Sequence, residues 1–224
     1  GKTTLFNVVC GFVRPDDGGI SWQGTPLRRV RPQNLARLGI ARTLQGLGLF
    51  ERLTVLENVV VGADRHARAG FGSALFALPR SDRDEQALRM RAFGVLAELG
   101  IQDVAGRLPG ALPYGIQKRV ALARALVAEP RLLLLDEPAS GLSESEMTEL
   151  GELIRSLRGR TAVMLVEHHM DLVMSVCDRI VVLDFGRVIA TGSPDQVRAD
   201  QAVLDAYLGR PVAPHIPTGE VDAH

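Results

Sequence analysis

The sequence predicts an α/β fold in which helices cover a mainly parallel sheet and a helical lobe is inserted into the core. Three observations predict it: a run of leucines that ends in two carboxylates, half of a phosphate-binding motif, and apolar patterns that alternate between strands and helices. A chain of 224 residues is long enough for one domain, or for one core with a small inserted lobe.

The leucine run is the most informative segment. Residues 132–135 are all leucine, and Asp136, Glu137 and Pro138 follow directly. Such a run is typical of a strand covered on both faces. Because ligands bind at the carboxyl ends of strands in open α/β sheets, we expect Asp136 and Glu137 to face a site. The alternative is a buried strand followed by an acidic turn.

The first four residues, Gly1, Lys2, Thr3 and Thr4, open an apolar segment. They match the second half of the pattern G-x-x-x-x-G-K-[ST], in which backbone N–H groups and a helix N-terminus hold phosphate oxygens. In this pattern Lys2 reaches the β- and γ-phosphates, and the Thr3 hydroxyl binds Mg²⁺. Together with a strand that ends in Asp-Glu, the motif predicts a nucleotide-hydrolysing fold.

The chain has no initiator methionine and begins inside this loop. We therefore expect an N-terminally truncated fragment that lacks the first glycines of the loop and the strand before them. Because the loop works through a ring of N–H donors, we expect these residues alone to bind ATP weakly and to be inactive in hydrolysis. The missing strand is expected to expose one edge of the sheet.

Further elements follow in order along the first half. We expect helices at residues 3–10 and 32–38, and strands at 20–23 and 40–44. Thr54 and Glu57 form a capping-box pattern that begins another helix. Residues 64–83 are interpreted as an insertion loop. An amphipathic helix follows, ended by Gly100, with an apolar stripe made of Leu88, Ala92, Leu96 and Leu99.

The second half continues the alternation. We expect a helix over residues 116–127, the leucine strand, and a helix that begins with the capping box of Ser143 and Glu146. A buried strand at 162–166, a hairpin around residues 184–187 and one final helix from Ser193 to residue 208 complete the core. Residues 210–224 carry few apolar anchors and are expected to be disordered.

Composition excludes several classes of function. The net charge is zero and the 26 basic residues are scattered, which does not indicate a nucleic-acid surface. No apolar run approaches the length that crosses a bilayer, so any role at a membrane is expected to come through partners. Cys10 and Cys177 lie in apolar, helical contexts without metal-ligand spacing, and we expect buried free thiols.

These motifs together resemble the ATP-binding-cassette ATPases over residues 1–209, with the helical lobe at about residues 50–127. The motifs are Gly-Lys-Thr-Thr, Gln45, the signature run at 112–126, the leucine strand with Asp136 and Glu137, Ser-Gly-Leu-Ser at 140–143, and His168. Within that family the chain resembles the ATPase subunit of branched-chain amino-acid importers. Less specific motifs support this resemblance within the family, among them Arg-Thr-Leu-Gln at 42–45 and Glu167 before His168.

The resemblance implies roles for individual residues. Asp136 would hold Mg²⁺ together with Thr3, and Glu137 would orient and deprotonate the attacking water. Gln45 would touch Mg²⁺ or that water, and His168 would contact the γ-phosphate. His169 stands where the family often has Asp, and we assign it no role.

The helix that begins near Gly115 would present its N-terminus to ATP held by a second ATPase subunit. The expected contacts on this side come from Pro113, Tyr114, Gly115, Ile116, Gln117 and Ser143. The chain departs from the family pattern here, because Pro113 removes the usual serine hydroxyl and Ile116 replaces a common glutamine. Ser143 stands where many members have Asp.

The expected function is an ATP- and Mg²⁺-dependent subunit of an importer at the cytoplasmic face of the plasma membrane. Its partners would be a second ATPase subunit, two permease subunits and, indirectly, a solute-binding protein, with no nucleic acid. The alternatives are transport of urea, amides or lipids, and a non-hydrolysing binding module of the same fold. The solute itself is chosen by partners that the sequence does not contain.

Overall fold

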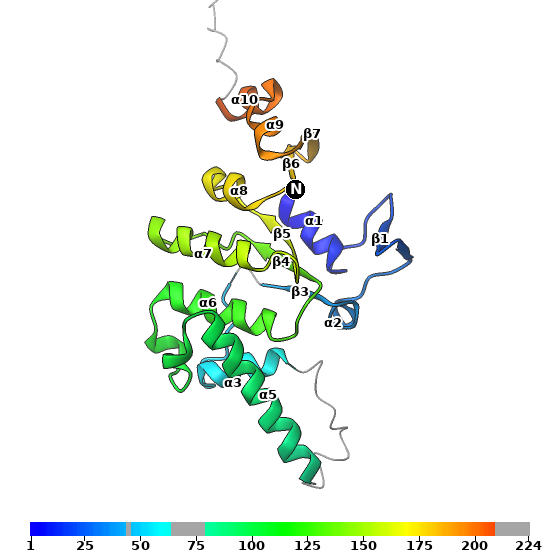
Figure 1. Ribbon diagram of the computed structural model, residues 1–224. Coiled ribbons are helices and arrows are strands. Elements are labelled where there is room, and N and C mark those ends of the chain that lie inside the picture. The colour runs from blue at the N-terminus through cyan, green and yellow to red at the C-terminus, as the bar shows by residue number, and fades with distance from the viewer. Residues whose placement is uncertain (44–45, 64–78, 209–224) are drawn as a thin grey trace, which may run out of the picture. The chain divides into compact units, whose positions relative to one another are not determined.

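The computed structural model describes residues 1–43, 46–63 and 79–208, which form two compact units (Figure 1). The larger unit is Lys2–Val176, and the smaller one begins at Cys177 and includes Gly1. Among the described residues, no helix is both long enough and apolar enough to span a bilayer.

A parallel sheet forms the centre of the larger unit, as the sequence predicts. Its strands are β3 (Ile40–Arg42), β4 (Leu132–Asp136) and β5 (Ala162–Val166), in the order β3-β4-β5. The leucines at 133–135 are fully or almost fully buried, because β4 is the middle strand. The expectation of a buried strand at 162–166 is only partly right, since β5 is an edge strand among the described residues and most of its side chains are half-buried.

A helix at the N-terminus of this unit packs on the sheet. It is α1 (Lys2–Val9), and Gly11, at φ +76°, follows its end. Phe6 of α1 is fully buried in a cluster with Ile40, Leu134 and Val166, one residue from each strand. The apolar side of α1 therefore fixes the helix against the strand that carries Asp136.

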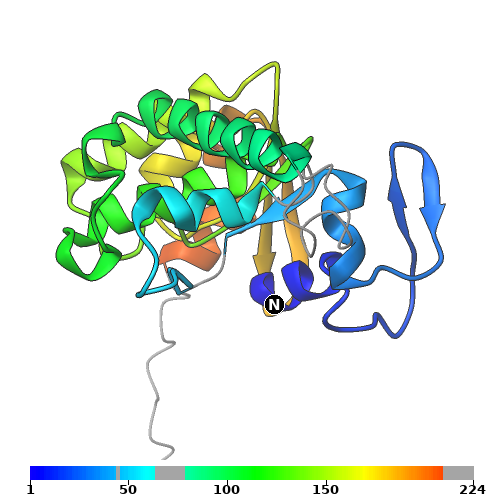
Figure 2. The same ribbon diagram turned by 90° about the horizontal axis from the view of Figure 1, so that it is seen from below.

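Three further helices pack against one another, within the range expected for the helical lobe (Figures 1 and 2). They are α3 (Val55–Gly62), α5 (Pro79–Glu98) and α6 (Tyr114–Leu126). Thr54 and Glu57 form the predicted capping box of α3. Ala92 and Leu96 are fully buried, as the predicted stripe of α5 requires, and Gly100 follows at φ +67°. The expected insertion loop at 64–83 lies mostly outside the described residues.

Shorter elements connect these parts. They are β1 (Ile20–Trp22), β2 (Thr25–Leu27), η1 (Pro32–Asn34), α2 (Leu35–Leu38), η3 (Gln102–Val104) and η4 (Pro109–Ala111). The β1–β2 hairpin adds a strand that the sequence analysis did not predict, because Pro26 lies within it. After β4, α7 (Glu144–Ser156) begins at the predicted Ser143 capping box, and α8 (Met170–Val176) follows β5.

The smaller unit contains β6 (Ile180–Asp184), β7 (Arg187–Gly192), α9 (Pro194–Arg198) and α10 (Gln201–Leu208). The predicted hairpin is present, and Phe185 and Gly186 at its tip have φ values of 41° and 83°. The prediction of one final helix is wrong. Asp200 interrupts it, because its Oδ1 accepts from Ala202 N at 2.9 Å and thereby caps a new helix.

Candidate functional site

The site is centred on Asp136, the last residue of β4. Its side chain is fully buried, and Arg42 of β3 donates from Nη2 to Asp136 Oδ2 at 2.9 Å. The other terminal nitrogen, Arg42 Nη1, donates to Asn7 Oδ1 on α1 at 2.8 Å. Arg42 therefore connects the predicted phosphate-binding helix to the predicted metal ligand. The sequence analysis noted Arg42 only as a family cue and missed this role.

The second oxygen of Asp136 remains available. Oδ1 is buried and has no hydrogen-bond partner among the described residues. A buried carboxylate oxygen without a donor is costly unless a ligand satisfies it. Because oxygen ligands are the ones that Mg²⁺ takes, the carboxylate fits the metal that the motif implies.

Glu137 follows in an unusual backbone conformation. Its φ is 48°, a left-handed value that costs a non-glycine residue free energy. Two hydrogen bonds hold it there: Glu137 N donates to Val166 O at 2.8 Å, and Ser140 N donates to Glu137 O at 3.2 Å. The half-buried Glu137 therefore occupies a turn that is fixed by the neighbouring strand.

The start of α6 packs on the loop that follows Glu137. Lys118 Nζ donates to the carbonyl oxygen of Pro138 at 2.6 Å and also to that of Ser140. Burial lowers the pKa of Lys118, and nearby carboxylates oppose that shift. A Cβ atom at Gly115 would collide with the Glu146 carboxylate, so α6 and α7 approach closely there. The signature helix and the loop after β4 thus form one packed assembly.

A pocket of about 530 Å³ opens at the same end of β4. It lies between α6 and α7, and Asp136 and Glu137 contribute to its wall. Lys118 and Glu146 line it as well, together with apolar groups such as Ile116 and Leu150. The pocket beside the two carboxylates is therefore lined by both charged and apolar side chains.

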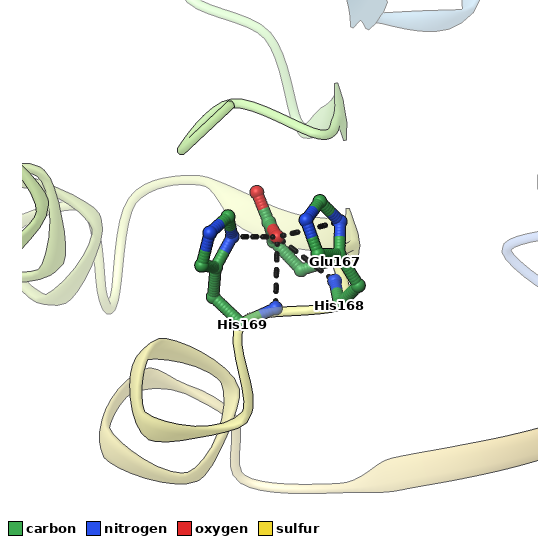
Figure 3. Close-up of side chains that lie close together, drawn as sticks. All are labelled: Glu167, His168 and His169. Carbon is green, nitrogen blue, oxygen red and sulfur yellow. Dashed lines mark hydrogen bonds and ion pairs between the residues drawn. The ribbon is translucent and has the colours of Figure 1, made fainter. Parts of the chain in front are cut away.

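The loop after β5 is organised by Glu167, whose side chain is fully buried (Figure 3). Glu167 Oε2 accepts from His168 N at 2.8 Å and from His169 N at 3.1 Å. The ring nitrogen His169 Nδ1 lies 2.9 Å from the same oxygen. From the sequence, no role was expected for His169, and Glu167 was only a family cue. The signal that could have indicated the role of Glu167 is a charged residue directly after an apolar strand.

The structure places the other predicted residues as follows. Lys2, Thr3 and Thr4 form the first turn of α1, where Lys2 and Thr4 are exposed and Thr3 is half-buried. Gly1 belongs to the smaller unit, and Gln45 lies outside the described residues. The side chain of His168 is 55% exposed.

The predicted contacts to a second subunit lie at the starts of α6 and α7. Pro113 precedes α6 and offers no side-chain acceptor, so the first N–H groups of the helix, which have no intrahelical partner, receive no side-chain cap from it. Gln117 Nε2 donates back to Leu112 O at 2.8 Å. Ser143 caps α7, since its hydroxyl oxygen accepts from Glu146 N at 3.4 Å and Ser143 N donates to Glu146 Oε2 at 2.8 Å.

Comparisons with known proteins agree with this arrangement. The family described as "ABC transporter" matches residues 1–140, and the family "Branched-chain amino acid ATP-binding cassette transporter" matches residues 187–213. BraF of Pseudomonas aeruginosa and LivG of Escherichia coli, both high-affinity branched-chain amino acid transport ATP-binding proteins, are each 40% identical, with 93% of this chain and 83% of the relative covered. LptB of Haemophilus influenzae, a lipopolysaccharide export system ATP-binding protein, is 35% identical, with 93% and 81% covered.

Solved structures give the same result. A nucleotide-free ATP-binding cassette from an ABC transporter has a TM-score of 0.78 at 27% identity, with 93% of this chain and 84% of that chain covered. The ADP conformation of such a cassette also has a TM-score of 0.78, at 28% identity, with the same coverage. The chain therefore belongs to the ABC transporter family and has the fold of its ATP-binding cassette.

Proposed function

We propose that this chain is the ATP-hydrolysing subunit of an importer for branched-chain amino acids, and that it uses Mg²⁺. The observation that carries the proposal is the end of β4, where one buried oxygen of Asp136 has no partner in the described part of the chain and Glu137 is held in a strained turn beside it. The 40% identity to BraF and LivG supports the class of solute.

The first turn of α1 binds the phosphates in this proposal. Its free N–H groups and helix dipole favour anions, and Lys2 adds a positive charge. Thr3 and Asp136 Oδ1 would hold Mg²⁺. When bound, the metal neutralises charge on the phosphates. Arg42 orients the Asp136 carboxylate toward α1, since it contacts both elements.

Glu137 acts on the water in the hydrolytic step. As the water oxygen bonds to the γ-phosphorus, Glu137 accepts the water proton, and the bond from the γ-phosphorus to the bridging oxygen breaks to release ADP. His168, on the neighbouring loop, donates to a γ-phosphate oxygen. Gln45 supports the metal or the water, as the family resemblance implies.

The variant Glu137→Gln tests this assignment, because the amide keeps the shape and loses the base. In the assembled transporter we expect hydrolysis to fall by roughly 10²–10⁴-fold, with nucleotide affinity changed less than about two-fold. Glu152→Gln is the matched control, since Glu152 is an exposed acid on α7 that lines the same pocket. Hydrolysis of Glu137→Gln at the control rate would contradict the role of Glu137.

A second ATPase subunit completes the site in this proposal. The free N–H groups at the start of α6 would bind the γ-phosphate held by that subunit, with Tyr114 and Gly115 in the first turn. Residues 138–143 would move with α6, because Lys118 ties the two segments together.

Permease subunits at the cytoplasmic face of the plasma membrane would bind near Phe50, whose side chain is 49% exposed. The buried Asn58 fixes Phe50, accepting from its N–H at 2.8 Å and donating to its carbonyl oxygen at 3.0 Å. Arg124 stacks over the ring at 6.0 Å. An exposed aromatic on a fixed backbone is typical of an interface.

Phe50→Asp is expected to reduce transport in membrane vesicles at least about ten-fold while basal hydrolysis stays within about two-fold, because a buried interface does not tolerate a charge. Phe93→Asp on α5, with a similarly exposed ring at 47%, is the control. Equal loss of transport and hydrolysis in Phe50→Asp would contradict the docking role.

The 35% identity to LptB favours a lipid as the second candidate solute. Uptake of labelled leucine by vesicles containing the complete transporter separates the two. Leucine uptake driven by ATP supports the first proposal, and ATP-driven lipid extraction without leucine uptake supports the second.

A further inference from the structure

We propose that Glu167 is a positioning residue that fixes the loop carrying His168 to the loop carrying Glu137. The proposal rests on the proposed function, in which these two loops supply the groups that act on water and on the γ-phosphate.

The Glu167 carboxylate bridges the two loops directly. Its Oε1 accepts from Ala139 N at 2.8 Å, two residues after Glu137. Its Oε2 accepts from His168 N at 2.8 Å. One oxygen therefore binds the loop after β4, and the other binds the loop after β5.

His169 completes the arrangement, and Figure 3 shows Glu167 between the two histidine rings. A carboxylate only accepts, so His169 Nδ1, at 2.9 Å from Oε2, is the donor. Burial acts to raise the pKa of Glu167, but hydrogen bonds from His169 and from three backbone N–H groups outweigh it and lower that pKa. Glu167 is therefore held as a carboxylate.

The bridge begins where the backbone ladder of the sheet ends. The last strand pair is Asp136 with Val166, and the hydrogen bond from Glu137 N to Val166 O follows it. Beyond this pair, hydrogen bonds to the Glu167 side chain link the two segments. Because a displacement of about 1 Å at a reacting group can cost about 10²-fold in rate, such a bridge controls catalysis without touching substrate.

A metal site is the competing interpretation, since Glu167, His168 and His169 all carry ligand atoms within 4.8 Å of one another. Oε2 already contacts three N–H groups, two from the backbone and one from the ring. These donors fill the positions that a cation would need, so the geometry points to hydrogen bonding.

Glu167→Gln is the first variant, because an amide nitrogen would face an N–H donor on one side or the other. We expect kcat to fall about ten- to hundred-fold, with KM for ATP within about two-fold. In a His168→Ala background the same change should cost less than it does in the wild type, because the part of its effect that acts on His168 is already lost. An equal loss in both backgrounds would overturn the proposal.

His169 supplies a milder test that avoids a folding defect. His169→Ala removes one donor, whereas His169→Asn keeps an N–H near the position of Nδ1. We expect a loss of kcat of about three- to ten-fold in the first and recovery to within about two-fold in the second. Equal activities of the two variants would contradict the bridge, as would a Zn²⁺-dependent rise in Tm seen in the wild type and lost in His169→Asn.

Hydrogen exchange separates this proposal from the proposed function. We expect the amides of Ala139, His168 and His169 to be protected in the wild type and to exchange at least about ten-fold faster in Glu167→Gln. If the amides behave as expected but the wild type does not hydrolyse ATP, the bridge is supported and the proposed function is contradicted. If the amides are unprotected in a wild type that hydrolyses ATP, the bridge is contradicted and the proposed function is not affected.

Discussion

Asp136 and Glu167 are two buried carboxylates at the ends of neighbouring parallel strands, and they are bound in opposite ways. Asp136 contacts one cation, Arg42, and its Oδ1 has no donor among the described residues. Both oxygens of Glu167 accept from N–H groups of its own chain. Burial is the same in the two cases, since each side chain is fully buried.

The difference teaches that burial alone does not identify a ligand-binding carboxylate. What distinguishes Asp136 is an oxygen, Oδ1, for which the described residues supply no donor, so a cation can complete it. The Glu167 oxygens accept hydrogen bonds from backbone N–H groups of both loops, so this residue positions the loops that form the site.

The same amide substitution should separate the two residues. Asp136→Asn is expected to reduce Mg²⁺-dependent hydrolysis at least about 10²-fold and to weaken Mg²⁺ affinity, because the carboxylate charge at the open oxygen is lost. Glu167→Gln should leave Mg²⁺ affinity within about two-fold. Magnesium titrations of hydrolysis and of nucleotide binding measure both. A larger loss of Mg²⁺ affinity in Glu167→Gln than in Asp136→Asn would reverse the assignment.

Acid should reveal the hydrogen bonds of Glu167. Its pKa is lowered in the folded protein, so its contribution to stability is present above the unfolded value of about 4.3 and is lost as pH falls through the folded pKa. Urea unfolding between pH 7 and about pH 3 should therefore show a shallower acid loss in Glu167→Gln than in the wild type. Glu152→Gln is the control, because Glu152 is an exposed acid on α7. Identical acid profiles for Glu167→Gln and the wild type would contradict the prediction.

The smallest expected effect concerns the helix after β4. Ser143→Ala should lower the free energy of unfolding by about 1 kcal/mol, because the capping box of α7 is lost. Ser143→Thr, which keeps a capping hydroxyl, should retain most of this stability. Chemical denaturation and nucleotide titration decide the outcome together. A loss of nucleotide affinity at unchanged stability would make the hydroxyl a ligand contact and not a cap.

The sequence by itself determined the features that depend on a few consecutive residues. The leucine run predicted a buried strand, and the spacing of Thr54 and Glu57, or Ser143 and Glu146, predicted two capping boxes. These patterns act within one or two turns of a helix or along one strand, so their signal is complete in a short segment. The same local reasoning failed at Asp200, where a capping side chain inside an apolar pattern divided one predicted helix into two.

Only the tertiary structure decided how the carboxylates are used. Arg42 and Asp136 are 94 positions apart, and Ala139 and Glu167 are 28 apart. Their contacts depend on the register of β3, β4 and β5, which places residues from three strands at one edge of the sheet. No local pattern encodes that register, because it follows from packing the sheet as a whole. The residue types were visible in the sequence, whereas the partner of each oxygen was set by the fold.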